Sequence, residues 1–353
     1  MITIDQNKGI RVLSLFDGIS CGRVALERAG LPVETYYASE IDKYAMSVAQ
    51  AMYPDTIQIG DVCKIDFTQY IGKVDIIIGG SPCQDLSIAK QNRQGLHGER
   101  SRLFWEYIKA LTIIKPKYFL LENVASMKNE DRAAITAVLR GIYPETECIM
   151  INSALVSAQQ RKRYYWTNWH VEQPENKGIL LKDILESGMP IRGDKSHAVI
   201  SSAGRTTERE NFKKHQGNLK AYCLDANYYK GGSLEHNLEK HNRELLAEPI
   251  RIGQLDGLGK GQANRIYSVR GKFVCLSANG GGGGAKTGLY KVDLPDGDYI
   301  VRKLTPRECC RLQTYDERCF DVANISNTQW YKAFGNGWTV DVIAHIFKQI
   351  PTE

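Results

Sequence analysis

Three absences narrow what this chain of 353 residues is. It contains no apolar run long enough to span a membrane, and its first residues lack the basic start and apolar core of a signal peptide, so we expect a cytoplasmic protein with no membrane partner. Its nine cysteines are odd in number and form no CxxC pair, which argues against both a disulfide framework and a zinc site. We therefore expect free thiols and no bound metal.

Charge is unevenly distributed along the chain. Residues 151–303 contain 24 lysines and arginines against 16 acidic residues, a net charge of +8, whereas the remaining residues have 22 against 24, a net charge of −2. A basic segment on a near-neutral body is typical of a lobe that binds a polyanion, although a solvated basic surface has the same composition. The length and the hydrophobic content of 42% favour a globular protein of two domains.

The N-terminal part has no GxGxxG sequence but predicts a strand, a glycine-containing turn and a helix, at 11–16, 17–22 and 23–29. Such a unit makes a nucleotide-type pocket, because glycines let a ligand approach the backbone and the helix start offers free N–H groups. Two acids end the next predicted strands: Glu40, placed to bind a ribose, and Asp61, placed to accept from an adenine amino group. A simple strand-to-helix connection, a helix cap and a surface carboxylate are the plainer alternatives.

A predicted buried strand at 74–78 ends in two glycines, a serine and a proline, which favour a sharp loop. The loop carries Cys83, and ligands of open α/β sheets bind beyond the carboxyl ends of the strands. A buried structural cysteine is the common alternative, but the composition of this loop favours a nucleophile. The polar, glycine-containing segment 90–102 that follows predicts a mobile active-site loop.

Another predicted strand, 118–121, ends at Glu122. In a desolvated pocket beside a nucleophile this carboxyl would share a proton with a base ring, whereas in solvent it would be an ordinary surface acid. Further along, residues 159–169 mix basic and aromatic side chains. That mixture indicates nucleic-acid contact or, equally, a strand with a solvated basic face.

The middle of the chain is less regular. Five consecutive glycines, Gly280–Gly284, lie between predicted strands at 272–276 and 289–292. A run of this kind favours either a flexible linker or a loop laid against a phosphate backbone.

The C-terminal part predicts two helices. Residues 302–313 combine Thr, Pro and Glu at the spacing of a helix start. Taken alone, Gly335–Gly337 predicts a turn before a helix at 340–348.

Ordered motifs spread from residue 12 to residue 345 resemble those of the cytosine-C5 DNA methyltransferase family. They are Phe16–Gly22, Glu40, Asp61, Pro82–Gln84, Glu122–Val124, Gln159–Arg163 and Gly335–Asn336. The glycine turn, the cysteine loop and the Gly-Trp pair near the end are similar in wording to the animal de novo methyltransferase catalytic domain. In length the chain is more similar to a stand-alone bacterial or phage enzyme.

The resemblance implies an α/β fold. This would be the Rossmann-like mixed sheet of S-adenosylmethionine-dependent methyltransferases, with helices on both faces, and a smaller irregular target recognition domain. Residues 1–170 and 304–353 would form the catalytic domain, and 171–303 the target recognition domain. The implied activity is that of a sequence-specific DNA (cytosine-5-)-methyltransferase acting on a flipped-out cytosine in double-stranded DNA, with S-adenosylmethionine as cofactor and S-adenosylhomocysteine as product.

The resemblance also implies roles for individual residues. Cys83 would attack C6 of the cytosine, Glu122 would bind the N3 and amino edge of the base, and Arg163 would hold the base and orient Glu122. Arg161 belongs to the same motif and is grouped with these catalytic residues. Implied cofactor contacts are Phe16, Asp17, Gly18, Ile19, Gly22, Glu40, Ile41, Asp61, Val62, Pro82, Leu103, Asn336, Gly337 and Trp338. Implied substrate contacts near the base are Ser81, Gln84, Ser87, Asn123 and Val124. The candidates for DNA contact in the basic segment are Arg251, Arg265, Arg270 and Lys286.

Two other functions compete with this one. A tRNA cytosine-C5 methyltransferase would share the catalytic order, but the long basic insert and the Ser-Pro-Cys loop favour DNA. A catalytically silent regulatory homologue would only bind DNA, and retention of Cys83, Glu122 and Arg163 argues against it. A cognate restriction endonuclease is a candidate partner, and a monomer is favoured over an oligomer.

Overall fold

The structure is a computed structural model of the whole chain. It describes six segments, which are 9–81, 102–186, 248–254, 265–276, 289–293 and 299–351. Five residues predicted to act in the site lie outside these segments: Pro82, Cys83, Gln84, Ser87 and Lys286. The glycine run Gly280–Gly284 lies outside them too. The predicted loop at 90–102 also lies outside them, except for its last residue.

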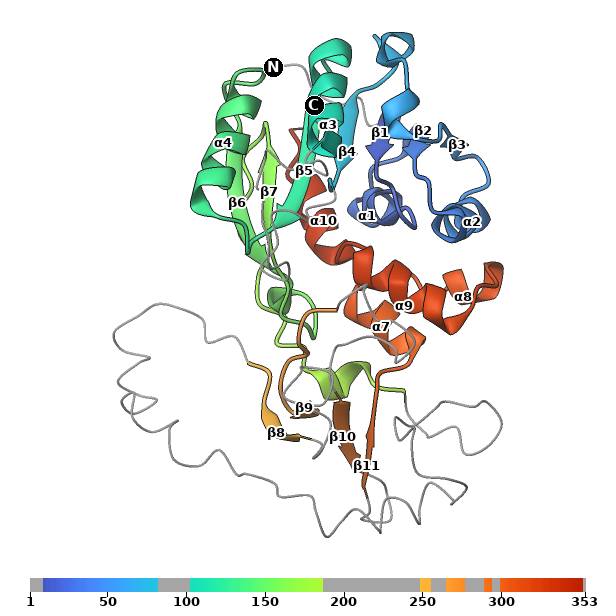
Figure 1. Cartoon of the computed structure of the whole chain (residues 1–353), viewed down its shortest axis with the longest axis vertical. Helices are drawn as coiled ribbons and strands as arrows, with labels where there is room; N and C mark the ends of the chain where they lie inside the picture. The colour runs from blue at the N-terminus through green and yellow to red at the C-terminus, as the bar shows by residue number, and fades with distance from the viewer. Residues whose placement is uncertain are drawn as a thin grey trace.

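A mixed seven-stranded sheet forms the upper part of the molecule in Figure 1, in the order β3-β2-β1-β4-β5-β7-β6. Its strands are β1 Ile10–Leu15, β2 Val33–Ser39, β3 Ile57–Gln58, β4 Ile76–Gly79, β5 Tyr118–Val124, β6 Glu147–Asn152 and β7 Lys162–Thr167. Strands β1 to β5 are parallel to one another, and β7 runs antiparallel to both β5 and β6. The predicted mixed α/β sheet is therefore confirmed.

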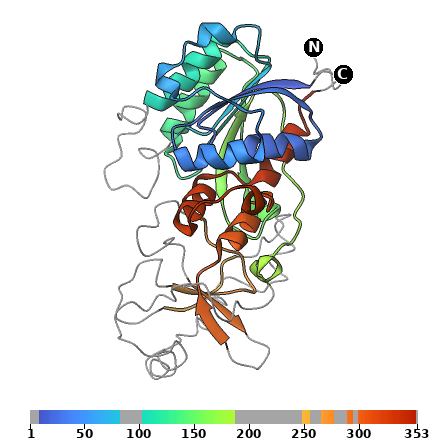
Figure 2. The same ribbon diagram turned by 90° about the vertical axis from the view of Figure 1, so that its right-hand side faces the viewer.

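Helices cover both faces of this sheet, as the side view in Figure 2 shows. Alternate residues of β1 enter two hydrophobic clusters: Val12 joins the cluster under α1 (Cys21–Ala29), and Leu13 joins the cluster under α3 (Arg102–Ile114). The first cluster also takes in α2 (Lys43–Met52) and α10 (Val340–Phe347), and the second takes in α4 (Asn129–Arg140). Within the described segments, no helix is both long and apolar enough to cross a membrane.

The local sequence accounts for most helix ends. Helix α1 stops where Gly30 adopts a left-handed conformation, with φ of 77°. Helix α2 starts at Lys43, because the Asp42 side chain accepts from the backbone N–H of Tyr44 and caps the helix. Helix α7 (Pro306–Leu312) has the predicted start, with Thr305 as N-cap.

A second, four-stranded sheet lies below the first in Figure 1, with α7, α8 (Cys319–Val322) and α9 (Asn327–Asn336) between them. Its order is β11-β10-β9-β8, and its strands are β8 Arg251–Gln254, β9 Arg265–Ser268, β10 Leu289–Asp293 and β11 Tyr299–Arg302. Tyr267 and Tyr290 of this sheet stack in series with Phe273 and belong to the same hydrophobic cluster as α1 and α10. The two sheets therefore share one apolar core.

The strand predicted at 272–276 is not formed. Phe273 makes only an isolated bridge to Gln159, in the segment before β7. In this bridge the Phe273 N–H donates to the Ala158 carbonyl and the Phe273 carbonyl accepts from the Gln160 N–H. Next to it, the buried ammonium group of Lys272 donates to the carbonyls of Ala154 and Ser157, both at 2.9 Å, and to that of Ile179. Burial lowers the pKa of this lysine to about 8. The segment thus ties the small sheet to the large one rather than extending either.

The turn predicted at Gly335–Gly337 is also wrong in part. Gly335 and Asn336 form the last residues of α9, and the helix ends at Gly337, whose N–H donates to Ala333. The helix persists through the glycine because Trp330 and Phe334 stack on each other in its buried face. Helix α10 then begins at Val340 as predicted.

Replacing Glu308 with alanine is expected to destabilise the fold by about 3–5 kcal/mol, because a charged partner would be left without its counterion in the interior. The fully buried Glu308 carboxylate is bridged by both terminal nitrogens of Arg302, at 2.6 and 2.7 Å, and also accepts from the backbone N–H of Thr305 and Glu186. Urea unfolding followed by circular dichroism measures the loss.

The matched control is Glu317→Ala. Glu317 also pairs with two arginines, Arg307 and Arg311, but its side chain is 35% exposed. Solvent-exposed pairs contribute about 1 kcal/mol or less. Equal losses in the two variants would contradict the role given to burial at Glu308.

Candidate active site

Glu122 is the centre of a cluster at the carboxyl edge of the large sheet. It lies near the end of β5, is only 8% exposed, and has both carboxylate oxygens occupied. Oε1 is 2.9 Å from Nε of Arg163, and Oε2 accepts from the indole Nε1 of Trp338 at 3.1 Å. Arg163 reaches Glu122 from the diagonal position of the neighbouring strand, since it stands opposite Val124 in the β5–β7 register. The predicted contact between Arg163 and Glu122 is present.

The end of β4, after which the sequence continues into the cysteine loop, lies beside this cluster. Strands β4 and β5 are parallel neighbours, with Gly79 opposite Leu121. After Gly79 come Gly80 and the buried Ser81, whose hydroxyl accepts from the Asn123 side-chain amide at 3.4 Å. The last residue before Pro82 and Cys83 is therefore in contact with the residue that follows Glu122.

The two glycines have a steric role beyond the turn that the sequence predicted. A Cβ on Gly80 would lie 2.7 Å from Oε2 of Glu122 and 2.9 Å from Nε1 of Trp338. A Cβ on Gly79 would lie 3.0 Å from both the Leu15 carbonyl and the Tyr107 ring. A side chain at Gly80 would push apart the two groups that meet there.

Arg161 is placed differently from Arg163. It is buried, and its terminal nitrogens donate to three backbone carbonyls, at 3.0 Å to Gly337, 3.3 Å to Gly335 and 3.2 Å to Leu276. These bonds connect β7 to the end of α9 and to the segment that follows Phe273. By these contacts Arg161 positions the backbone next to Trp338, whose indole in turn bonds to the Glu122 carboxylate.

Cys275 is a member of this cluster that the sequence did not indicate. Its sulfur lies 3.4 Å from Arg161 and 4.0 Å from Arg163. Burial raises the pKa of this thiol, but the two guanidinium groups outweigh burial and hold the pKa below its ordinary value. No local motif marks Cys275, because both arginines are more than a hundred residues away in the chain.

A second group of predicted residues surrounds the ends of β1 and β2. The Glu40 carboxylate accepts the backbone N–H groups of Gly18, Ile41 and Asp42, each at 2.8 Å. Gly18 has a φ of 61°, which favours glycine, and the non-glycine Phe16 has a φ of 60°. Through Gly18, the Glu40 carboxylate therefore holds the turn after β1 against the end of β2.

Asp17 is buried within this turn. Its carboxylate accepts from the hydroxyls of Ser20 at 2.5 Å and Tyr36 at 2.8 Å. Burial raises the pKa of Asp17 to about 6, although these hydroxyl bonds oppose the rise. Ile19 beside it is buried, and its carbonyl accepts from the Tyr315 hydroxyl. The side chains of Asp17 and Ile19 are thus part of the interior that shapes the turn.

The raised pKa of Asp17 predicts a pH dependence that Asp17→Asn should remove. Since its folded-state pKa lies above the unfolded value, the folded state binds more protons, and this group's stabilisation is lost as pH rises through about 6. Between pH 4 and pH 7 the free energy of unfolding of the variant, relative to the wild type, should rise by about 2 kcal/mol. Urea unfolding at the two pH values measures it.

Asp75→Asn serves as the control for this shift. Burial opposes ionisation of Asp75, but its bonds to Arg11 outweigh burial and lower its pKa. Its carboxyl is therefore ionised in the folded state and more than half ionised in the unfolded state over this range, so the difference from wild type should change far less than for Asp17→Asn. An equally small change for Asp17→Asn would contradict the assignment.

The residues at the ends of β1, β2 and β3 fit an adenosine-type ligand. Ile41 offers an exposed apolar face, with 76% of its surface accessible. Glu40 uses three of the roughly four acceptor positions of a carboxylate, which leaves one for a hydroxyl donor. Asp61 caps the short helix Val62–Lys64 through the Cys63 N–H at 3.0 Å. One side of this carboxylate is thereby oriented by the backbone.

The other predicted cofactor contacts line the same edge. Val62 is buried, and Leu103, at the start of α3, packs against the cluster that contains it. Gly22 has no room for a side chain, since a Cβ would lie 2.4 Å from Ile78 and 3.5 Å from the Trp338 ring. Asn336, the last residue of α9, is exposed.

Three of the four candidates for DNA contact belong to the part of the chain around β8 and β9. Arg251 is exposed and donates to Gln254 at 2.5 Å, Arg265 is half-buried, and Arg270 is exposed. Strands β8 and β9 lie in the lower part of Figure 1, below the large sheet.

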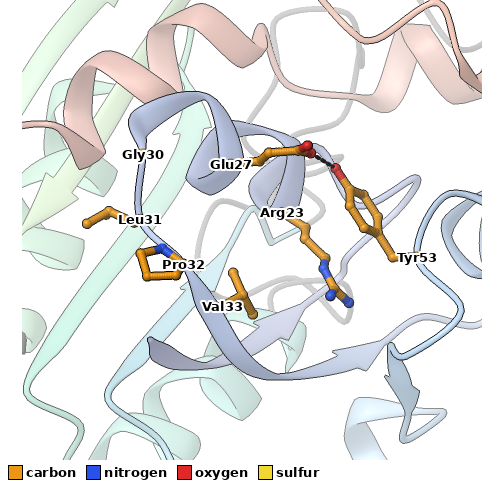
Figure 3. Close-up of a pocket in the computed structure, with 7 residues that line it drawn as sticks. All are labelled: Arg23, Glu27, Gly30, Leu31, Pro32, Val33 and Tyr53. Atoms are coloured by element: carbon orange, nitrogen blue, oxygen red, sulfur yellow. Dashed lines mark hydrogen bonds between the residues drawn. The ribbon is translucent and has the colours of Figure 1, made fainter. Parts of the chain in front are cut away.

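A cavity of about 380 Å³ lies beside α1 and the start of β2 (Figure 3). It is lined by Arg23, Glu27, Gly30, Leu31, Pro32, Val33 and Tyr53. Its polar groups are already paired, because Arg23 bonds to Asp55 and Thr56 and Glu27 accepts from the Tyr53 hydroxyl. None of the predicted site residues lines it.

The sheet order, the glycine turn with its strand-end acids and the carboxylate cluster define an α/β protein of the Rossmann-like methyltransferase class. The C-5 cytosine-specific DNA methylase family model matches residues 10–352. The chain belongs to this family, and its enzyme class is that of the DNA (cytosine-5-)-methyltransferases.

Similar proteins agree with this assignment. The orphan methyltransferase M.SPRI of Bacillus phage SPR is 28% identical, with 97% of each chain covered. The type II methyltransferase M.HhaI of Haemophilus parahaemolyticus is also 28% identical, over 97% of this chain and 94% of that protein. Among solved structures, the Entamoeba histolytica methyltransferase EhMeth superposes with a TM-score of 0.64 at 15% identity, over 97% of this chain and 98% of the other. The S. pombe Dnmt2 methyltransferase has a TM-score of 0.60 at 16% identity, over 96% and 97%.

Proposed function

We propose that this chain transfers a methyl group from S-adenosylmethionine to C5 of a flipped-out cytosine in duplex DNA, through a covalent adduct between Cys83 and C6. The observation that carries the proposal is the Glu122 carboxylate. It is buried, paired with Arg163 at 2.9 Å, and adjacent to the strand end that leads into Cys83. A base-binding carboxylate and a nucleophilic loop on neighbouring strands are what attack on a pyrimidine ring requires.

The proposed reaction begins with the attack of Cys83 on the cytosine ring. Cytosine C5 is a poor nucleophile, so the Cys83 thiolate adds to C6 and the electrons of the C5–C6 double bond become available at C5. Glu122, held by Arg163, binds the N3 and amino edge and stabilises the charge that develops in the ring. When bound, S-adenosylmethionine supplies an electrophilic methyl group. Transfer of that methyl group to C5 would leave S-adenosylhomocysteine as the product. A base or a water molecule then takes the C5 proton, the C5–C6 double bond re-forms, and the C6–S bond breaks to release Cys83 as the thiolate.

The cofactor would be held by the fitting residues at the carboxyl edge. Glu40 would accept from one ribose hydroxyl with its remaining acceptor position, and Ile41 and Asp61 with Val62 would bind the adenine. The turn after β1 would hold the methionine end. The proposed contacts of the methionine end are Phe16, Gly18, Ile19 and Gly22. Pro82 and Leu103 would lie nearest the reacting methyl group, and the C-terminal segment would add Asn336, Gly337 and Trp338.

We assign DNA recognition to residues 171–303. A cytosine inside a duplex is out of reach of Cys83, so it must be flipped out, at a cost of a few kcal/mol that DNA contacts have to offset. The excess positive charge of the middle of the chain and the exposed Arg251 and Arg270 support this assignment. Ser81, Asn123 and Val124 lie beside Glu122 and would contact the flipped nucleotide.

The test is incorporation of labelled methyl groups from S-adenosylmethionine into duplex DNA and, in parallel, into transfer RNA. We expect incorporation into DNA, and bisulfite sequencing of DNA from cells expressing the chain should show methylation confined to one sequence. Methylation of transfer RNA alone would refute the DNA assignment. Incorporation into neither substrate would favour the regulatory, DNA-binding alternative.

A further inference from the structure

The second oxygen of Glu122 has a partner that the cofactor role of Trp338 does not explain. The indole Nε1 of Trp338 donates to Oε2 at 3.1 Å while Arg163 occupies Oε1. A glutamate carboxylate held at one oxygen can still rotate about the Cγ–Cδ bond. A hydrogen-bond donor on the second oxygen prevents that rotation. Hydrogen bonds to ionised groups are also stronger than bonds between neutral groups.

The residues before and after Trp338 are both held by hydrogen bonds. The carbonyl of Gly337 accepts from Arg161 at 3.0 Å and from the Gln313 side chain at 3.2 Å. On the other side, the buried hydroxyl of Thr339 bonds to Ser153 at 2.8 Å and Gln313 at 3.0 Å. The indole is therefore presented by a network of buried polar groups rather than by a free loop.

Space for the contact is provided by two glycines on neighbouring elements. A Cβ on Gly80 would come within 3 Å of both bonded atoms, Oε2 and Nε1, and Gly22 lies against the edge of the Trp338 ring. The absence of side chains at Gly80 and Gly22 thus lets the Trp338 indole reach the carboxylate.

We propose that Trp338 is a positioning residue for catalysis: its indole N–H fixes the second oxygen of Glu122 so that the carboxylate faces the flipped base. The inference rests on the proposed function and adds to it a contact within the protein. In this arrangement one donor on each oxygen leaves further acceptor positions on both oxygens for the base edge.

Trp338→Phe removes the N–H and keeps an aromatic ring. We expect kcat for DNA methylation to fall about tenfold to a hundredfold, the range that loss of one charge-assisted hydrogen bond produces. Because phenylalanine keeps the aromatic ring that would contact S-adenosylmethionine, binding of this cofactor, measured by calorimetry, should change by no more than about twofold. Trp169→Phe is the matched control, because it also loses an indole bond, to the Ile346 carbonyl at 3.3 Å, and it should keep kcat near that of the wild type.

A double-mutant cycle with Glu122→Ala, followed in single turnovers with enzyme in excess, separates positioning from a structural role. If Trp338 acts through the carboxylate, Trp338→Phe should cause less than about a twofold further loss in the Glu122→Ala background. An undiminished loss in that background, or a kcat unchanged in Trp338→Phe, would overturn the inference. Gly80→Ala, which displaces both bonded atoms, should lower kcat at least as much as Trp338→Phe.

These results distinguish the inference from the function on which it rests. A wild-type chain that methylates no DNA would refute the proposed function. An active wild type in which Trp338→Phe and Glu122→Ala are independent would refute only the role of Trp338.

Discussion

Replacing Cys83 with alanine should abolish methyl transfer, with a loss of more than about 10⁴-fold, because the ring cannot be activated at C5 without a nucleophile at C6. The same variant should fail to form a covalent complex with duplex DNA that contains 5-fluorocytosine. In the wild type that complex should accumulate, since fluorine cannot leave C5 as a proton does. Labelled methyl incorporation and denaturing gel electrophoresis measure the two effects.

Cys148→Ala is the matched control for this substitution. Cys148 is half-buried on β6, and burial raises the pKa of its thiol to about 11, so it remains protonated and unreactive near neutral pH. This variant should retain activity and trapping. Methylation that persists in Cys83→Ala would sink the covalent mechanism, whatever the control shows.

Replacing Glu122 with glutamine should lower kcat by about 10²–10⁴-fold, the range for loss of a positioned acid–base group. The amide keeps the size of the side chain but cannot carry the negative charge that pairs with Arg163 at 2.9 Å and stabilises the protonated ring edge. Single-turnover methylation measures the loss, and calorimetric binding of S-adenosylmethionine should remain close to that of the wild type.

Glu147→Gln provides the comparison for Glu122. Glu147 is also a strand carboxylate, on the edge strand β6, but it is exposed and pairs with His170 at the surface. Its substitution should leave methylation unchanged. If both variants lose less than about tenfold, Glu122 does not carry the role proposed for it.

The sequence predicts the elements whose signals are local. The start of α7 follows from Thr305, Pro306 and Glu308, because a capping box needs only neighbours in the chain. Gly30 ends α1 for a similarly local reason, its left-handed conformation. The contact of Arg163 with Glu122 came from the family resemblance, and the structure shows it as a diagonal pair on adjacent strands.

The features that the sequence did not predict correctly depend on contacts with other side chains, most of them distant in the chain. The predicted strand at 272–276 was wrong because Phe273 bonds to the segment before β7, more than a hundred residues earlier. The predicted turn at Gly335 was wrong because aromatic stacking within α9 outweighs the low helix propensity of glycine. The position of Cys275 between two arginines has no local signal at all.

The direction of β7 limits which insertions and deletions the active site can tolerate in the connection between β6 and β7. Because β7 runs opposite to β5, its first residues, not its last, reach the carboxyl edge, so Arg163 arrives at Glu122 directly after the connection from β6. Side chains alternate between the two faces of a strand, so one residue gained or lost in that connection without a compensating bulge would turn Arg163 toward α4. A change of two residues would restore the face but move the cation one pleat along the strand. The length of the segment between β6 and β7 is therefore part of the active site, even where its side chains never touch the base.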